Sequence, residues 1–250
     1  MNGFDSDGLI EDLAKAETPA ARFNTLTAGL AKLGLDTINY GFFDMQAAAL
    51  AQADIAFLTT MSDDWMRYYV DRSLSLTDSH VLRVRAGKIT PYFWGESVIN
   101  RLSSHEEHTT ASEAMEAGLR SSLCVPLTSP MDPFAPVAGI SLGSSMDESE
   151  LKKVVQEHGP TLLSIAYVFH NASIRQIWQE QAGSKPLSQR EKDCLQYLAD
   201  GRRQDSIADL LGLARVTVEM HLRKARHKLG ARTLTEAVAK AVIFGEIKRG

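Results

Sequence analysis

The sequence predicts an α+β protein in two parts, an N-terminal α/β/α sandwich over residues 1–178 and an all-α domain of four helices over residues 187–250. Two observations lead to this prediction. In the first part, segments with strand-like composition lie between segments with helical periodicity, whereas the second part carries helical periodicity only. The polar segment 179–186, QEQAGSKP, contains Gly and Pro and is predicted to be the linker between them.

The distribution of charge divides the chain at the same place. Residues 185–250 hold 14 Lys+Arg and 8 Asp+Glu, a net charge of +6, and residues 1–184 hold 13 and 23, a net charge of −10. A basic module joined to an acidic one indicates that the C-terminal part binds nucleic acid. The whole chain, with 44% hydrophobic and 23% charged residues, has the composition of an ordinary globular protein.

The N-terminal part begins with a helix, since Thr18 precedes Pro19 at a predicted first helical position. The predicted strands are 37–43, 55–60, 121–127 and 136–142, and further helices are predicted over 65–70 and 78–86. A long amphipathic segment follows over 148–178. Because Gly159 and Pro160 interrupt it, we expect either two helices or one kinked helix.

Helix caps and glycines delimit the helices of the C-terminal part. Ser188 and Glu191 form the S-x-x-E capping-box pattern at the first helix, and Thr233 and Glu236 repeat it at the fourth. The second helix, 205–211, is followed by Gly212 and then, after a tight turn, by the third helix.

The third helix has one apolar stripe and one basic face. The stripe is Val218, Leu222, Ala225 and Leu229, and the opposite face carries Arg215, Glu219, Arg223, Arg226 and His227. Two helices joined by a short turn, with the second basic on its outer face, form the helix-turn-helix pattern, in which one helix enters the major groove of DNA. A small helical bundle with a solvated basic face is the alternative that spacing leaves open.

The residues of this part resemble the LuxR-type DNA-binding domain. The matching residues are Leu187-Ser188-x-Arg190-Glu191-x-x-x-Leu195, Gly201, Ile207-Ala208-x-x-Leu211 and Thr217-Val218-x-x-His221-Leu222-x-x-Ala225-x-x-Lys228-Leu229. Ala214 departs from the family, which usually has a capping Ser there, and predicts a cap weaker by about 1 kcal/mol. The DNA contacts that we expect are Arg215, Val216, Thr217, Glu219, Met220, Arg223, Lys224, Arg226 and Lys228. Arg223 would bind guanine, Glu219 would accept from cytosine, and Lys224, Arg226 and Lys228 would meet phosphate or solvent.

No enzyme motif is visible. The chain has no G-x-S-x-G elbow, no P-loop and no H-E-x-x-H, so we expect neither an enzyme nor a cofactor or metal. His105 and His108 can be read as a metal pair, but a solvated face is the better interpretation, and His80, His158 and His170 show no partner in the sequence.

The expected setting is the reducing cytoplasm. Cys124 and Cys194 lie in different predicted parts and do not suggest a disulfide. The first residues, MNGFDSDGLIEDL, have no basic segment followed by an apolar one, so no signal peptide is expected. No apolar run approaches about 18 residues, so no membrane span is expected.

Three aromatic residues and one carboxylate in the middle of the chain suggest a ligand site. Trp65 and Tyr69 are one helical turn apart and share a face, Asp78 follows nine residues later, and Trp94 comes next. An indole N–H, a phenol and a carboxylate beside apolar surface can orient a small amphipathic ligand. On spacing alone, aromatic core packing is the alternative.

These four residues, with Gly118 and the segment 122–126, resemble the signature of the autoinducer-binding domain of LuxR-type quorum-sensing regulators. The resemblance implies a small-molecule effector, an N-acyl homoserine lactone. Trp65 would donate to the lactone carbonyl and Asp78 would accept from the amide N–H. Tyr69 and Trp94 would wall the acyl chain and head group, and Ser141 would reach the ligand.

Three departures from the family concern this site. Met61 stands where many members have a Tyr that bonds the acyl carbonyl, Ser79 where Pro is usual, and Ser122 where Gly is common. They leave open a lactone with a different chain or 3-substituent, a non-lactone signal, or a regulator that works without ligand.

The expected mechanism is ligand-gated binding of a homodimer to a near-palindromic DNA site. The sequence leaves open whether the ligand promotes DNA binding or releases the protein from DNA. The predicted dimer surface is the helix 160–178, with the fourth C-terminal helix as a second contact. A phosphorylation-controlled response regulator is the third reading, but the alternating strands and helices of a receiver domain are not visible.

Overall fold

The computed structural model describes residues 4–43, 56–127, 137–181 and 186–248. The chain divides into two compact units, residues 1–174 and residues 175–250. The first unit mixes helices with a sheet, and the second is entirely helical. The predicted α+β class, with an all-α C-terminal domain, is therefore confirmed.

The first unit is built on a five-stranded antiparallel sheet with the order β2-β1-β5-β4-β3. Its strands are β1 (Thr37–Phe43), β2 (Ala56–Thr59), β3 (Tyr92–Trp94), β4 (Ser121–Pro126) and β5 (Val137–Ser144). Four of these strands were predicted to within two residues at each end, whereas β3 was missed because three residues show no alternation. The antiparallel pairing also excludes the parallel sheet of a receiver domain.

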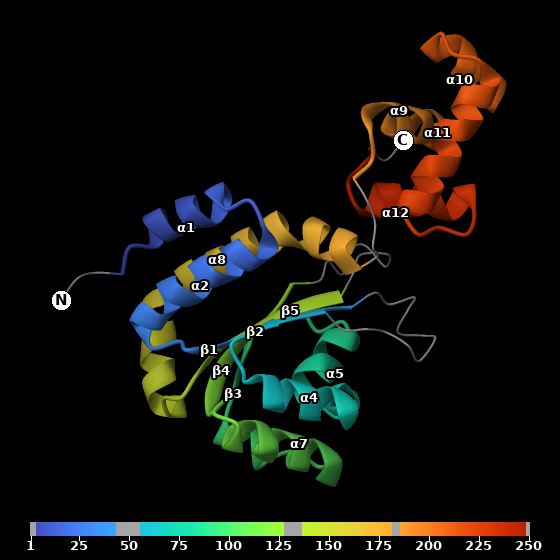
Figure 1. The fold of residues 1–250 in the computed structure, drawn as a ribbon. Coiled ribbons are helices and arrows are strands. Elements are labelled where there is room, and N and C mark those ends of the chain that lie inside the picture. Colours follow the sequence, from blue (N-terminus) through green and yellow to red (C-terminus); the bar gives the residue numbers. More distant parts are fainter. Residues whose placement is uncertain (1–3, 44–55, 128–136, 182–185, 249–250) are drawn as a thin grey trace. The chain divides into compact units, whose positions relative to one another are not determined.

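Helices cover both faces of this sheet, which confirms the predicted α/β/α sandwich. On one face lie α1 (Ser6–Lys15), α2 (Pro19–Leu30) and α8 (Glu148–Gln181), and on the other lie α4 (Asp63–Asp71), α5 (Ser79–Arg85) and α7 (His105–Glu116) (Figure 1). Short helical segments complete the unit: η1 (Ala31–Leu33), η2 (Leu74–Leu76) and α6 (Glu96–Ile99).

The two faces of the sheet differ in character. On β1, Ile38, Tyr40 and Phe42 are fully buried, and the ring of Tyr40 meets Phe169 of α8 edge-on with centroids 5.2 Å apart. Because side chains alternate along a strand, Asn39 and Gly41 point to the opposite face. That face borders a cavity, as described below, and its small and polar residues leave room there.

Helix α8 is one continuous helix with Pro160 inside it, so the expectation of two separate helices is wrong. Pro160 has no N–H to donate, and its ring disfavours a straight helix. The two parts of α8, olive and gold in Figure 1, run in different directions, as the kinked-helix alternative predicts. The helix continues to Gln181, so residues 179–181 of the predicted linker are helical. Residues 182–185 of that linker lie outside the described residues.

The second unit contains the four predicted helices, α9 (Gln189–Ala199), α10 (Gln204–Leu211), α11 (Arg215–Lys228) and α12 (Leu234–Ile243). The capping box at α9 is present: Glu191 N donates to Ser188 Oγ and Ser188 N donates to Glu191 Oε2. The predicted stripe of α11, Val218, Leu222, Ala225 and Leu229, is buried throughout. In the described residues of both units, no helix has the length and apolar character needed to cross a bilayer.

Candidate ligand-binding site and DNA-binding surface

A cavity of about 110 Å³ lies between the sheet and helices α4 and α5. Its wall is mostly apolar, and its polar members are Asn39, Trp65, Tyr69, Asp78, His80, Tyr92, Cys124 and Ser141. A smaller cavity of about 30 Å³ shares Trp65, Tyr69, Asp78 and His80 with it and adds Trp94. The two cavities are therefore adjacent, and together they are called the ligand site, whose smaller part Trp94 borders.

Asp78 is held in place by two hydrogen bonds. It is the N-cap of α5, where Oδ1 accepts from the backbone N–H of His80 at 2.7 Å. Its other oxygen, Oδ2, accepts from the hydroxyl of Tyr69 at 2.8 Å. Burial and the carboxylate raise the pKa of Tyr69 well above its usual value, so the phenol stays protonated and donates. Each carboxylate oxygen has a second lone pair, so Asp78 can accept from a further N–H.

Trp65 lies on the same helical face as Tyr69, as the spacing predicts, with ring centroids 6.3 Å apart. Ser62 is the N-cap of α4, and its Oγ accepts from the backbone N–H of Trp65. The indole N–H of Trp65 has no hydrogen-bond partner among the described residues. Trp65 and Asp78 thus bring an unpaired donor and an oriented acceptor to one cavity.

Trp94 lies apart from the larger cavity and borders only the smaller one. It is 2% exposed and packs in a core cluster with Ile99, Ala111 and Leu119. Its ring meets that of His80 edge-on, with centroids 5.2 Å apart. Trp94 is therefore a core residue that also lines the smaller cavity, so both interpretations left open by the sequence apply to it.

Met61 and Ser141 both line the larger cavity. Met61 brings no hydroxyl to it. Ser141 is 5% exposed, and its Oγ is buried with no hydrogen-bond partner in the described part of the chain. Ser122 is fully buried, and its Oγ lies 3.2 Å from Cys124 Sγ. Ser79 is the first residue of α5, the position where Pro is well tolerated.

His80 lines the cavity but was not predicted as a site residue. Its Nδ1 lies 2.9 Å from the hydroxyl of Tyr92, and its Nε2 lies 3.3 Å from Sγ of Cys124. Burial opposes the charged ring, but Cys124 and Asp78 outweigh it and raise the pKa of His80 above its usual value. The only signal in the sequence was its position two residues after the cap Asp78, because its partners lie on β3 and β4.

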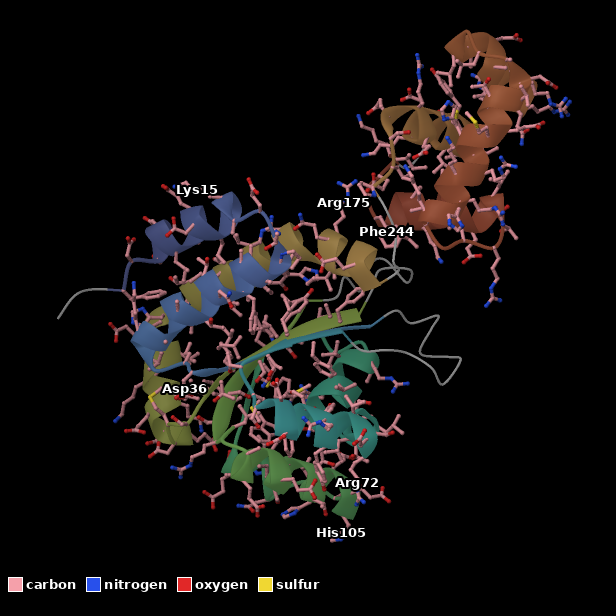
Figure 2. All side chains as sticks on the ribbon, viewed as in Figure 1. Lys15, Asp36, Arg72, His105, Arg175 and Phe244 are labelled. Carbon is pink, nitrogen blue, oxygen red and sulfur yellow. The ribbon has the colours of Figure 1, made fainter. Side chains whose placement is uncertain are left out.

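The remaining histidines form no metal site in the described residues. His105 begins α7, and Figure 2 shows it on the outer side of that helix, away from the sheet. His108 Nδ1 lies 3.4 Å from Ser112 Oγ on the same helix. His170 pairs with the buried Tyr40, 2.9 Å from Nδ1 to the hydroxyl, and burial lowers the pKa of His170 to about 4.

Helix α11 presents most of its polar side chains to solvent. Arg215, Val216, Glu219, Arg223 and Lys224 are exposed, and Thr217, Met220 and Arg226 are partly buried. Val216 is 70% exposed, which is unusual for an aliphatic side chain. Arg215 forms ion pairs with Asp205 and with Glu219, each at 3.1 Å. Ala214 caps the helix without a side-chain hydrogen bond, as its departure from Ser predicts.

Lys228 is engaged inside the unit and so stands apart from the other expected DNA contacts. Its Nζ lies 2.7 Å from Oε2 of Glu191, which is 3% exposed, and it also donates to the carbonyl of Pro186. Burial alone would raise the pKa of Glu191, but hydrogen bonds from Lys228 and Ser188 lower it below its usual value. This pair joins α11 to α9, and the expected contact of Lys228 with phosphate or solvent stays a prediction.

Two family models match the chain, one for each unit. The model "Autoinducer binding domain" matches residues 18–173, which contain the cavity. The model "Bacterial regulatory proteins, luxR family" matches residues 185–241, which contain α9, α10 and α11. The chain belongs to the LuxR family of quorum-sensing transcriptional regulators. The members of this family that it resembles are regulators and not enzymes.

Individual relatives of this LuxR-family regulator match over nearly its whole length. The quorum sensing-dependent transcriptional regulator RpaR of Rhodopseudomonas palustris is 26% identical over 244 residues, covering 96% of this chain and 93% of the relative. The transcriptional activator CarR of Pectobacterium carotovorum is 23% identical over 217 residues, covering 84% and 86%.

Solved structures share the fold. Escherichia coli SdiA superposes with a TM-score of 0.60 at 19% identity, covering 96% of both chains. CepR2 from Burkholderia cenocepacia has a TM-score of 0.56 at 18% identity, covering 69% of this chain and 96% of that one. The likeness to SdiA, which extends over nearly the whole chain, confirms the architecture of a sheet-based unit followed by a helical unit.

Proposed function

We propose that this regulator binds an N-acyl homoserine lactone in the ligand site and that the bound ligand controls DNA binding by α11. One observation carries the proposal. Trp65 and Asp78 bring an unpaired donor and a fixed acceptor to the wall of one largely apolar cavity. An acyl homoserine lactone has a carbonyl and an amide N–H close together at the end of an apolar chain, which is the complementary pattern.

Each residue has a definite part in this complex. Trp65 donates its indole N–H to the lactone carbonyl, and Asp78 accepts from the amide N–H. Trp94 and Tyr69 wall the head group and the start of the chain. Ser141 Oγ, buried and unpaired, donates to an oxygen on the acyl side. The solved structure of CepR2, whose name describes it as N-acylhomoserine lactone dependent, supports the ligand class.

Ligand binding is linked to the stability of the first unit. Burying an acyl chain contributes about 0.8 kcal/mol per CH₂ group. A ligand that binds only the folded state stabilises it by about 2.7 kcal/mol at 100 times its Kd. We propose that this gain in folding free energy orders the first unit and its dimer, and that the ordered dimer controls DNA binding.

The DNA complex follows from the geometry of α11. A two-fold dimer brings two copies of this helix to two half-sites of a near-palindrome. Arg223 is exposed and unpaired among the described residues, so its guanidinium is available to bind guanine. Glu219 is also exposed, and its carboxylate is proposed to accept from cytosine. The dimer contact is proposed at residues 160–178 of α8, where Tyr167 is 46% exposed, with α12 as the second contact.

A regulator with a non-lactone signal is the second candidate. Met61 removes the hydroxyl that many family members present to the acyl carbonyl, so the site is less committed to one head group. A solved complex of SdiA is described as containing octanoyl-rac-glycerol, an acyl compound without a lactone ring. That complex supports testing acyl glycerols beside the lactones.

The deciding experiment is expression of the full chain with and without a panel of acyl homoserine lactones and octanoyl glycerol. Soluble yield and melting temperature are measured for each. A gain of about 2.7 kcal/mol corresponds to a rise of roughly 5–10 °C for a chain of this size. A rise with lactones supports the proposal. If the melting temperature rises with octanoyl glycerol alone, or rises with none of the compounds, the lactone is rejected and the second candidate is selected.

A further inference from the structure

A cysteine and a histidine meet in the wall of the cavity. Cys124 lies on β4 and His80 on α5, and both line the cavity. Sγ of Cys124, a free cysteine, lies 3.3 Å from Nε2 of His80, within hydrogen-bond distance. We call these two residues the Cys–His pair. Neither of them contacts the signal in the complex proposed above.

The ring of His80 is held from its other side by Tyr92. The hydroxyl of Tyr92 lies 2.9 Å from Nδ1, and Tyr92 is the residue of β3 that pairs directly with Cys124. A hydrogen bond to one ring nitrogen fixes the role of the other, so Tyr92 directs Nε2 toward the sulfur. A nucleophile, a base beside it and a third group that orients the base is the arrangement that activates nucleophiles in proteins.

The ring can take the proton of the thiol. Burial opposes a charge on the ring of His80, but the sulfur of Cys124 outweighs it and raises the pKa of His80 to about 9. The hydroxyl of Ser122 lies 3.2 Å from Sγ and brings a second possible donor to the sulfur. The thiolate is the reactive form of cysteine, and neighbouring cations and donors favour it.

A buried free cysteine ordinarily acts as a small apolar side chain, and Cys194 does so. It is 0% exposed in the second unit, and burial raises the pKa of its thiol, which keeps it in the unreactive form. Cys124 is also buried, at 5% exposed, but it borders a cavity and contacts an imidazole. A residue that only fills apolar space needs neither.

The space next to the sulfur is accessible to a small molecule. The cavity has a volume of about 110 Å³ and a mostly apolar wall. Ser141 of β5, which pairs directly with Cys124, also lines it, and its buried Oγ has no partner in the described part of the chain. Buried polar atoms in native proteins almost always have partners, so this exception marks a place where a molecule from outside the chain binds.

Two features limit the kind of molecule that reacts there. The mostly apolar wall disfavours charged reagents and accepts short carbon compounds. The chain has two cysteines, and Cys194 lies in the other unit, so an oxidised Cys124 has no second thiol in its own unit for a disulfide. Addition of a thiol to a carbon–carbon double bond needs neither a second thiol nor an oxidant.

We infer that Cys124 is a covalent modification site for small α,β-unsaturated carbonyl compounds and that the adduct occupies the ligand site in place of the signal. The second part of this inference rests on the proposed function. Sγ, as the thiolate, attacks the β-carbon, and a carbon–sulfur bond forms. The π electrons of the double bond move to the α-carbon, which takes the former thiol proton from Nε2 of His80. No group leaves, and no oxidant or reductant is consumed.

The test treats the folded full chain with 3-buten-2-one, a short unsaturated ketone, and follows the adduct by intact mass spectrometry. Peptide mapping of the wild type locates the adduct, so the assignment needs no variant. We expect Cys124 to react at least about tenfold faster than Cys194 in the same molecule, because only Cys124 has a positioned base. Butanone, which lacks the double bond, should give no adduct. Equal rates at the two cysteines, or no adduct on Cys124, would overturn the inference.

A variant of His80 tests the part of the ring. His80→Asn keeps a polar side chain but has no basic nitrogen, so the rate at Cys124 should fall at least about tenfold. His158→Gln is the matched control on α8, where His158 contacts Phe4 and Glu157, and it should keep the wild-type rate. An unchanged rate in folded His80→Asn contradicts the Cys–His pair. Should that variant fail to fold, Tyr92→Phe decides, because it leaves the ring without its orienting hydroxyl and should also slow the reaction.

Competition with N-octanoyl-homoserine lactone tests whether adduct and signal share the site. Lactone at 100 times its Kd, with binding verified by the rise in melting temperature, should slow the reaction of Cys124 at least about tenfold. An unchanged rate with lactone bound overturns the shared site. Failure of the lactone to bind overturns the proposed function alone, because the adduct on Cys124 forms without it. Reaction of Cys124 with hydrogen peroxide and not with the ketone overturns the assigned class of compound.

Discussion

Replacing the carboxylate of Asp78 by an amide is expected to weaken signal binding without unfolding the site. In Asp78→Asn the remaining side-chain oxygen can still accept from the backbone N–H of His80, so the cap of α5 is kept. The new amide can donate to the oxygen of Tyr69 in place of accepting from it. Both contacts of the native carboxylate therefore have neutral substitutes, and the loss of unliganded stability should stay below about 1 kcal/mol, or about 2–4 °C.

The loss of ligand affinity is larger. The variant replaces a charged acceptor for the amide N–H of the ligand by a neutral one, or turns an N–H toward it. Hydrogen bonds to charged groups contribute about 1.5–3 kcal/mol. At about 1.4 kcal/mol per tenfold, the concentration of signal needed for half of the response should rise roughly 10- to 150-fold.

The assay is a ligand titration of melting temperature, repeated as a reporter dose response in cells. Asp64→Asn is the matched control, because Asp64 lies on α4 with its side chain 90% exposed and pairs only with Arg67 among the described residues. Asp78→Ala, in contrast, removes the cap and leaves the buried Tyr69 hydroxyl unpaired, so it should also lower the melting temperature. A dose response of Asp78→Asn that equals the wild type, with melting temperature unchanged, would refute the assigned role of Asp78.

Three further predictions concern DNA, the fold of the second unit and pH. Arg223→Ala should abolish sequence preference in a gel-shift assay, since the exposed guanidinium is the proposed guanine contact. Glu191→Gln should destabilise the second unit by about 3 kcal/mol in thermal melts, because it leaves Lys228 without its buried counter-charge. The pKa of His170 is about 4 in the folded chain against a usual value of 6.5, so protons favour unfolding between these values. Stability should therefore fall by up to roughly 3 kcal/mol as pH drops from about 6.5 to 4, and His170→Gln should remove this part of the pH dependence.

Each of these predictions has a matched control. Lys224→Ala should weaken binding to all DNA sequences alike, so retained discrimination in Arg223→Ala would reject the guanine contact. Asp209→Asn, an exposed carboxylate on α10, should leave the melt of the second unit within about 0.5 kcal/mol. His158→Gln should keep the acid slope of the wild type, and an identical slope in His170→Gln would show that burial of His170 is not its source.

Local signals were sufficient for most elements of the fold. Helix starts at Ser188 and Thr233 follow from side chains that bond backbone a few residues away, so the sequence carries them directly. Helix α7 was not clearly predicted, because its sequence HEEHTTASEAME buries only Thr110 and Ala111 and has no apolar stripe. The interior Pro160 shows the opposite limit, since a local breaking signal was overridden by the packing of a long helix.

The site was predictable where its residues share one helix. Trp65 and Tyr69 are four residues apart, so helical periodicity alone brings them together. Asn39 and Cys124 enter the same site through the register of β1, β5 and β4, and His80 enters it through the contacts of α5 with β3 and β4. No local pattern fixes either. The ion pair of Lys228 was not predicted for the same reason, because its partner Glu191 lies on another helix.

The affinity of the full chain for its operator, measured by fluorescence anisotropy with and without saturating acyl homoserine lactone, tests the central claim most directly. Occupancy is verified in the same samples by the rise in melting temperature. A ligand-gated regulator should show a Kd that changes at least about tenfold on binding, a coupling free energy in the usual allosteric range, with Asp78→Asn needing more ligand for the same change. An equal Kd with the site empty and with the site occupied would contradict control of α11 by the cavity.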